Sequence, residues 1–145
     1  MTLEEKATKF DELLISIGLK LLKYFAPEGV SLSIKEMLLV EILGQREFAT
    51  VTYLASALSQ PLTTMTSAIT RMVRNGYLER RRIEEDRRVV LVSLSAQGQA
   101  FYEQHRQEHI QMAMGLLRAL PEQEQDRVIY VLDQIASAVS EDSVK

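Results

Sequence analysis

Arginines gather in one short segment of this 145-residue chain. Residues 71–88 hold seven arginines and four acidic residues, a net charge of +3, whereas residues 48–70 carry no Asp, Glu, Lys or Arg. The rest of the chain holds ten basic and sixteen acidic residues, so the overall charge is −3. Because clustered guanidinium groups are suited to binding phosphates, this segregation of charge predicts a local site for a polyanion.

Hydroxyl side chains precede these arginines at helical spacing. Apolar positions predict a helix over 62–74 that buries Leu62, Met65, Ile69, Met72 and Val73. The outward side is then expected to carry seven polar residues: Thr63, Thr64, Thr66, Ser67, Thr70, Arg71 and Arg74. Such groups reach base edges and phosphates when a helix lies in the major groove of DNA. The alternative is a solvated helix face, because Ser and Thr are common at protein surfaces.

The segment before this helix predicts a shorter helix and a tight turn. Thr52 is expected to cap the shorter helix, and Pro61 to end it. After the longer helix, Asn75 and Gly76 predict a left-handed stop of the kind that glycine favours. Two short helices that meet at a tight turn are typical of the helix-turn-helix.

A β-hairpin is expected directly downstream. Residues 77–82 and 88–94 have the pattern of strands, with the polar run 83–87 between them. Its arginines are Arg80, Arg81, Arg82, Arg87 and Arg88. An arginine run alone is more typical of an exposed strand edge. Next to a helix-turn-helix it predicts a wing that follows a duplex backbone and enters the minor groove.

Further helices are expected where apolar residues recur at spacings of three and four. Ser33 and Glu36 have the spacing of a capping box, and Pro121 suits a first helical turn. The expected ranges are 3–24, 33–44, 95–118 and 121–139. The sequence therefore predicts a mainly α fold with a small β-hairpin, a winged helix-turn-helix in one domain over residues 1–145.

Composition narrows the possible functions. The chain has no cysteine, which excludes disulfides, thiolate nucleophiles and cysteine-based zinc sites. Neither a glycine-rich phosphate loop nor a Ser-His-Asp arrangement in strand context is found, so we expect no enzyme activity and no cofactor. A basic and apolar leader is missing at the amino terminus, and no window approaches the roughly 20 apolar residues of a membrane span. We therefore expect a cytoplasmic protein without a membrane partner.

His105 and His109 are four residues apart, a spacing that places two metal ligands on one helix face. They are the only histidines of the chain, and two ligands do not make a site. Histidines at the surface or in an interface are therefore the favoured interpretation, and a metal site is the weaker alternative.

The sequence resembles the multiple antibiotic resistance regulator (MarR) family of winged-helix repressors. The segments that carry the resemblance are 51–58 for the first helix of the pair, 65–80 for the second and 86–95 for the wing. The order and length of the helices match along nearly all of the chain. Many members begin the second helix with a Ser or Thr cap, whereas this chain has Pro61 there, which predicts a shifted helix start.

The resemblance implies specific roles. An Asp-x-Arg pattern at the wing, here Asp86 and Arg88, implies an arginine in the minor groove that the aspartate braces. Beside Arg88, Arg82 and Arg87 are further expected DNA contacts of the wing. The resemblance also implies a homodimer, formed by residues 1–25 and 96–139 around a DNA-binding lobe at 33–95. A small apolar or aromatic effector is a further possible partner.

The implied function is therefore a repressor that binds double-stranded DNA at a pseudo-palindromic operator. A second class of function stays open, because winged helices also serve as protein-interaction modules that never touch DNA. The clustered arginines favour the first interpretation.

Overall fold

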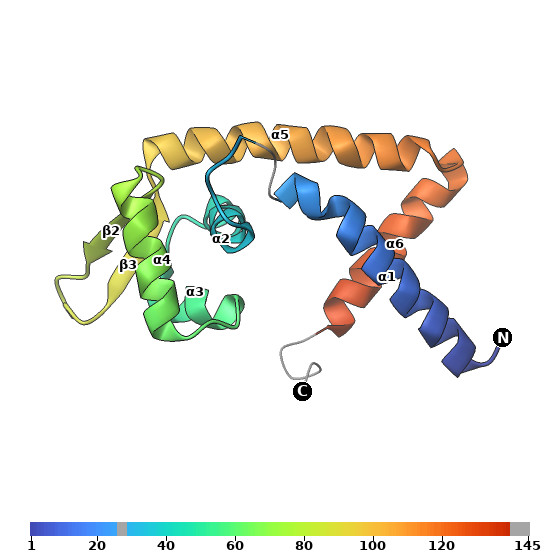
Figure 1. The fold of residues 1–145 in the computed structure, drawn as a ribbon, viewed down its shortest axis with the longest axis horizontal. Helices are drawn as coiled ribbons and strands as arrows, with labels where there is room; N and C mark the ends of the chain where they lie inside the picture. Colours follow the sequence, from blue (N-terminus) through green and yellow to red (C-terminus); the bar gives the residue numbers. More distant parts are fainter. Residues whose placement is uncertain (26–28, 140–145) are drawn as a thin grey trace. The chain divides into compact units, whose positions relative to one another are not determined.

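The structure, a computed structural model, describes residues 1–25 and 29–139. Its elements follow one another as shown in Figure 1: α1 (Leu3–Phe25), α2 (Ile34–Gly44), β1 (Ala49–Thr50), α3 (Val51–Ala57), α4 (Leu62–Arg74), β2 (Leu78–Arg82), β3 (Val90–Leu94), α5 (Ala96–Arg118) and α6 (Glu122–Ala138). The mainly α fold with a small β-hairpin is confirmed. The order of elements is that of a winged helix-turn-helix.

The chain divides into two compact units, Met1–Gln104 and His105–Lys145. The first unit contains the whole expected lobe, residues 33–95. The expected single domain over 1–145 also includes residues 26–28 and 140–145, which lie outside the described residues. Within the described ranges, no helix has the length and apolar character needed to cross a membrane.

An apolar core holds α2, α3, α4 and the hairpin together. Its largest fully buried side chains are Leu39, Val40, Leu43, Leu54, Ile69, Met72, Leu78 and Val92. Tyr102, near the start of α5, joins the same cluster. Burial of one such side chain stabilises a fold by about 1.5–3 kcal/mol. The core therefore fixes the position of α4 against the hairpin that follows it.

The sheet has three antiparallel strands in the order β1-β3-β2. The expected hairpin is formed by β2 and β3, with Arg82 opposite Val90. The short extended segment before α3 adds β1, in which Ala49 pairs with Val92. Because side chains alternate along a strand, Arg80 and Arg82 share one face of β2 and Arg81 lies on the other.

Thr50, and not Thr52, caps α3. The Thr50 hydroxyl accepts a hydrogen bond from the backbone N–H of Tyr53 at 3.1 Å, and the Thr50 backbone is extended. The prediction of Thr52 was wrong because β1 ends at Thr50 and the helix begins at the next residue. Ser33 caps α2 as expected, and its hydroxyl accepts from the N–H of Glu36 at 3.2 Å.

The turn after α4 has the expected left-handed stop. Gly76 has a φ of +89°, which favours glycine. The N–H of Gly76 donates to the carbonyl of Val73, and the N–H of Tyr77 donates to the carbonyl of Met72. These two bonds form a Schellman motif, which ends α4 and directs the chain into β2.

Close backbone packing at Gly98 joins the first turn of α5 to the start of the hairpin. A Cβ atom at Gly98 would overlap the carbonyl oxygen of Tyr77, which also accepts a hydrogen bond from the N–H of Ser95 at 3.0 Å. We expect Gly98→Ala to lower the free energy of unfolding by about 1–3 kcal/mol in urea denaturation, because backbone must move to admit the methyl group.

Gly115 in the same helix is the matched control, since a Cβ there meets no atom within 4 Å. Gly115→Ala is expected to leave stability unchanged or to raise it by up to about 1 kcal/mol. Equal losses in the two variants would contradict the close packing at Gly98.

Candidate nucleic-acid interface

Helix α4 has a buried side and a polar side. Met65, Ile69 and Met72 are buried in the core. The seven polar residues expected on the outward side are all exposed: Thr63, Thr64, Thr66, Ser67, Thr70, Arg71 and Arg74. The helix begins at Leu62, the start that the apolar pattern predicts, and its N-cap residue Pro61 makes no side-chain capping bond.

The polar side of α4 divides by helical spacing into a centre and two edges. Thr63, Ser67 and Arg74 lie opposite the buried residues, at the centre of the polar side. Thr66 and Thr70 lie along the edge that faces the hairpin, where Thr70 contacts Arg80. The centre of this surface is thus the part that projects furthest from the core.

Leu62 is exposed, with 54% of its surface accessible, although the sequence pattern predicted it to be buried. It occupies the first position of α4, on the hairpin side of the helix. There it lines an open cavity of about 410 Å³ together with Thr66, Val89 and Val90. The pattern failed at this position because apolar spacing does not show where the core ends along a helix.

Two threonine hydroxyls of α4 bond to the helix backbone. The Thr66 hydroxyl donates to the carbonyl of Leu62 at 2.8 Å, and the Thr70 hydroxyl donates to the carbonyl of Thr66 at 2.9 Å. Thr70 also accepts from Nη1 of Arg80 at 3.0 Å. Thr70 therefore links α4 to β2, whereas Thr63, Thr64 and Ser67 make no side-chain hydrogen bond to the described parts of the chain.

Arg71 anchors α4 to α2 through an ion pair. Its Nη2 atom lies 3.1 Å from Oε1 of Glu36, whose side chain is only 6% exposed, while that of Arg71 is 50% exposed. The carboxylate of Glu36 is thereby engaged by Arg71, and the second half of the expected capping box is not seen in the described residues. A buried carboxylate needs such a partner, so Arg71 has a structural role besides any contact with DNA.

Asp86 holds Arg88 at the tip of the hairpin. Oδ1 of Asp86 accepts from the backbone N–H and from Nε of Arg88, both at 3.1 Å, and Oδ2 accepts from Nη2 at 3.2 Å. The Arg88 side chain is nevertheless 91% exposed. The structure thus brings the two residues together in a fork that fixes the guanidinium and leaves its outer edge in solvent.

The same contacts fix the charge of Asp86. Hydrogen bonds from the Arg88 side chain lower the pKa of Asp86, its backbone N–H lowers it further, and slight burial opposes both. At pH values above the usual pKa of an aspartate, Asp86 is ionised and its bonds to Arg88 are fully formed. They are lost only as the pH falls through the lowered pKa. Asp86 is therefore ionised throughout the neutral range.

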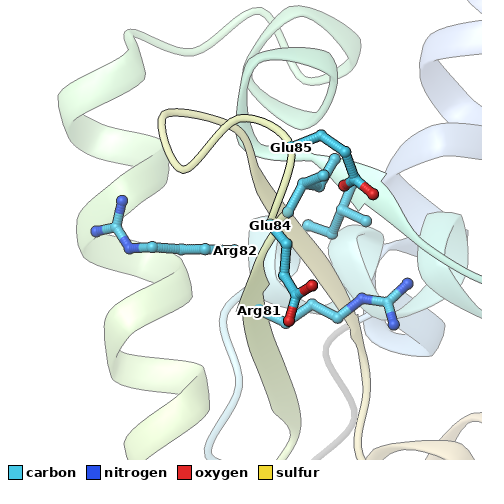
Figure 2. Close-up of a pocket in the computed structure, with 6 residues that line it drawn as sticks. Arg81, Arg82, Glu84 and Glu85 are labelled. Atoms are coloured by element: carbon cyan, nitrogen blue, oxygen red, sulfur yellow. The ribbon is translucent and has the colours of Figure 1, made fainter.

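The arginines of β2 point to opposite faces of the hairpin. Figure 2 shows Arg82 on the α4 side, and Arg81, Glu84 and Glu85 on the other side. Nη1 of Arg82 donates to the carbonyl of Arg87 at 2.7 Å, which closes the loop between the strands. Arg80 lies on the same face of β2 as Arg82. The alternation of side chains along a strand is the signal that distinguishes both from Arg81.

The histidine pair lies on α5. The ring centroids of His105 and His109 are 6.2 Å apart, and Nδ1 of His105 is 3.5 Å from Oε2 of Glu108. His105 is buried, at 5% exposure, so it is not a surface residue. Within residues 1–25 and 29–139, no group of three or more His, Cys, Asp or Glu side chains is placed to hold a metal ion.

The chain is similar to a known family and to solved structures of DNA-binding proteins. The model of the MarR family matches residues 32–90, which span the helix-turn-helix and most of the hairpin. FabT from Streptococcus pneumoniae, solved in complex with DNA, is similar in structure, with a TM-score of 0.79 and 26% sequence identity over 90% of this chain and 95% of that one. No match is found among curated proteins.

Two structures with lower sequence identity share the fold. A MarR family protein from Bacillus stearothermophilus has a TM-score of 0.85 at 19% identity, over 95% of this chain and 98% of that one. A mutant MarR from E. coli, complexed with operator DNA, has a TM-score of 0.67 at 24% identity, over 93% of this chain and 99% of that one. The similarity extends beyond the residues that the family model matches.

The Arg71–Glu36 pair generates a prediction about stability. Arg71→Ala is expected to lower the free energy of unfolding by about 1–3 kcal/mol in urea denaturation, because Glu36 keeps a buried charge without its partner. The control is Arg74→Ala on the same helix, whose effect should stay within about 0.5 kcal/mol.

Adding Glu36→Gln to Arg71→Ala should restore part of the loss, since a neutral amide is less costly to bury than a carboxylate. If the double variant is no more stable than Arg71→Ala alone, the unpaired charge is not the cause.

Proposed function

We propose that the chain is a transcription regulator of the MarR family, a repressor that binds a pseudo-palindromic operator as a homodimer. Each α4 lies in a major groove, and each hairpin reaches the flanking minor groove. The twofold symmetry of a dimer requires half-sites whose centres are about 10 base pairs apart. Occupation of the operator then blocks transcription.

This proposal rests on the observation that α4 and the hairpin contact each other and together form one polar surface. The hydrogen bond from Arg80 to Thr70 joins the two elements, and Thr66 and Arg88 line the same cavity. Hydroxyl groups suited to reading bases therefore lie beside cations suited to binding phosphates. Duplex DNA offers both kinds of partner, because its major and minor grooves lie side by side.

The proposed roles differ among the residues of the surface. Thr63, Thr64 and Ser67 read bases, and Arg74 contacts phosphate. Thr66 contacts DNA from the edge of the polar side. Arg88 enters the minor groove while Asp86 braces it, and Arg82 and Arg87 contact the backbone. Thr70 and Arg71 position α4 through Arg80 and Glu36.

Exposed apolar side chains support the homodimer. On α1 they include Phe10, Leu13, Leu14, Ile17 and Leu22, and on α6 Ile129, Tyr130, Val131 and Leu132, each more than 40% exposed. Large apolar side chains left exposed in such number are typical of subunit interfaces. We assign residues 1–25 and 96–139 to that interface, with residues 33–95 as the DNA-binding lobe of a single domain over 1–145.

Effector control and location complete the proposal. Similarity to the MarR family supports a small apolar or aromatic ligand that changes the separation of the two recognition helices and so releases the operator. The regulator works where the DNA is, in the cytoplasm, and neither catalysis nor a cofactor takes part.

A fluorescence anisotropy titration of labelled duplex DNA at several salt concentrations tests DNA binding. The logarithm of the association constant is expected to fall linearly with the logarithm of the salt concentration, by about 0.9 for each phosphate contacted. Absence of salt-sensitive binding would favour a protein-interaction module instead.

Arg88→Ala is expected to weaken binding to every duplex and to reduce that salt slope by about one, because one phosphate-region contact is lost. Arg81→Ala is the matched control, since Arg81 lies on the opposite face of the same hairpin from Arg82. Its slope should remain close to that of the wild type. Equal changes in the two variants would contradict the assigned orientation of the wing.

Ser67→Ala is expected to change sequence preference, because the Ser67 hydroxyl lies at the centre of the polar side of α4. Loss of one hydrogen bond should reduce discrimination at one base pair of each half-site by about fivefold. Competition binding with singly substituted duplexes measures the effect. Arg74→Ala should instead weaken all duplexes alike, and a uniform loss in Ser67→Ala would argue against base reading.

A further inference from the structure

A groove runs along the hairpin side of α4. It consists of two open cavities, of about 410 and 390 Å³, which share Thr66 and Val90 as lining residues. Leu62 and Val89 line the first cavity, and residues 80–82 line the second. Of these arginines, Arg82 points towards α4, whereas the side chain of Arg81 points to the other side of the hairpin (Figure 2). We call the two cavities together the α4–wing groove.

One end of the α4–wing groove is apolar and open to solvent. Leu62 is 54% exposed there, and Val89 and Val90 are partly buried. Thr50 and Thr52 also line this end, and the Thr50 hydroxyl is engaged as the cap of α3. Apolar side chains left in water at a polar surface lose the favourable free energy of burial, so this end is suited to an apolar part of a ligand.

The other end of the groove carries fixed cations. Arg80 is held by Thr70 at 3.0 Å, and Arg82 by the carbonyl of Arg87 at 2.7 Å. Each of these bonds uses one of the five N–H donors of a guanidinium, so donors remain on both side chains for an anion. Arg88, at the rim of the apolar end, adds a third positive charge.

An apolar surface next to fixed cations matches the alternation of sugar and phosphate in a nucleic-acid strand. The proposed function also requires a strand at this place. With α4 in the major groove and Arg88 in the minor groove, the backbone that separates the two grooves has to pass between them.

Resting on that proposed function, we propose that the α4–wing groove binds the sugar–phosphate backbone of one DNA strand, with a deoxyribose against Leu62, Val89 and Val90 and the adjoining phosphates at Arg80 and Arg82. The apolar end then recognises deoxyribose as such. A 2′-hydroxyl turned towards Leu62 and Val89 loses its water and meets no hydrogen-bond partner on these side chains. The groove therefore favours DNA over RNA at this nucleotide.

Single-ribonucleotide scanning tests the proposal. The probe is the tightest-binding duplex recovered from random sequences, with one ribonucleotide placed in turn at each position of both strands. Wild-type protein should bind about tenfold less tightly when the ribonucleotide occupies one symmetry-related position in each half-site. Salt-sensitive binding of the unmodified duplex, measured in the same series, reports on the proposed function separately.

Leu62→Ala should reduce that penalty to less than about twofold, because the shortened side chain leaves room for water at the 2′-hydroxyl. Thr63→Ala, the next residue on the same turn, should keep it, since Thr63 lies at the centre of the polar side. The melting temperature of Leu62→Ala should stay close to that of the wild type, because Leu62 is 54% exposed.

A 2′-fluoro nucleotide at the sensitive position separates the hydroxyl from the shape of the sugar. Fluorine keeps the sugar pucker of RNA without a group that needs a hydrogen-bond partner, so wild-type affinity should be largely retained. The proposal is overturned if no ribonucleotide position is penalised in a duplex that binds normally. It is equally overturned if Leu62→Ala keeps the full penalty, or if 2′-fluoro is penalised as strongly as ribose.

Discussion

Burial of Met65, Ile69 and Met72 fixes the rotation of α4 about its axis, and the rest of the interface depends on that rotation. At 3.6 residues per turn, a slip of one position would turn the helix by about 100° and carry Ser67 from the centre of the polar side to its edge. The cost of exposing buried methionine and isoleucine side chains prevents this. The core thus decides which hydroxyl groups face outward.

Positive charge at this surface has two uses. Arg71, Arg80 and Arg82 each bond to another group of the chain, at Glu36, Thr70 and the Arg87 carbonyl, and so position α4 and the hairpin. Arg74 is exposed, and the Arg88 side chain is 91% exposed with its orientation set by Asp86. Held side chains lose less conformational freedom on binding, so a phosphate contact to them costs less entropy.

The sequence was sufficient for the order of elements and for the polar side of α4, because helical periodicity and turn residues act locally. Gly76 ends α4 as predicted, since only a left-handed residue suits that turn. Leu62 and Thr52 were misassigned because the boundaries of the core and of β1 depend on strands far along the chain. The roles of Arg71 and Arg80 also required tertiary contacts, with Glu36 and Thr70, that no local pattern reveals.

The central claim is that α4 and the hairpin form one DNA-binding surface, presented twice in a symmetric dimer. Selection of bound duplexes from a random pool tests it most directly, because one result reports binding, symmetry and spacing together. The account predicts enrichment of a pseudo-palindrome whose half-site centres lie about 10 base pairs apart. A pool without enrichment, or an enriched site without twofold symmetry, would contradict it.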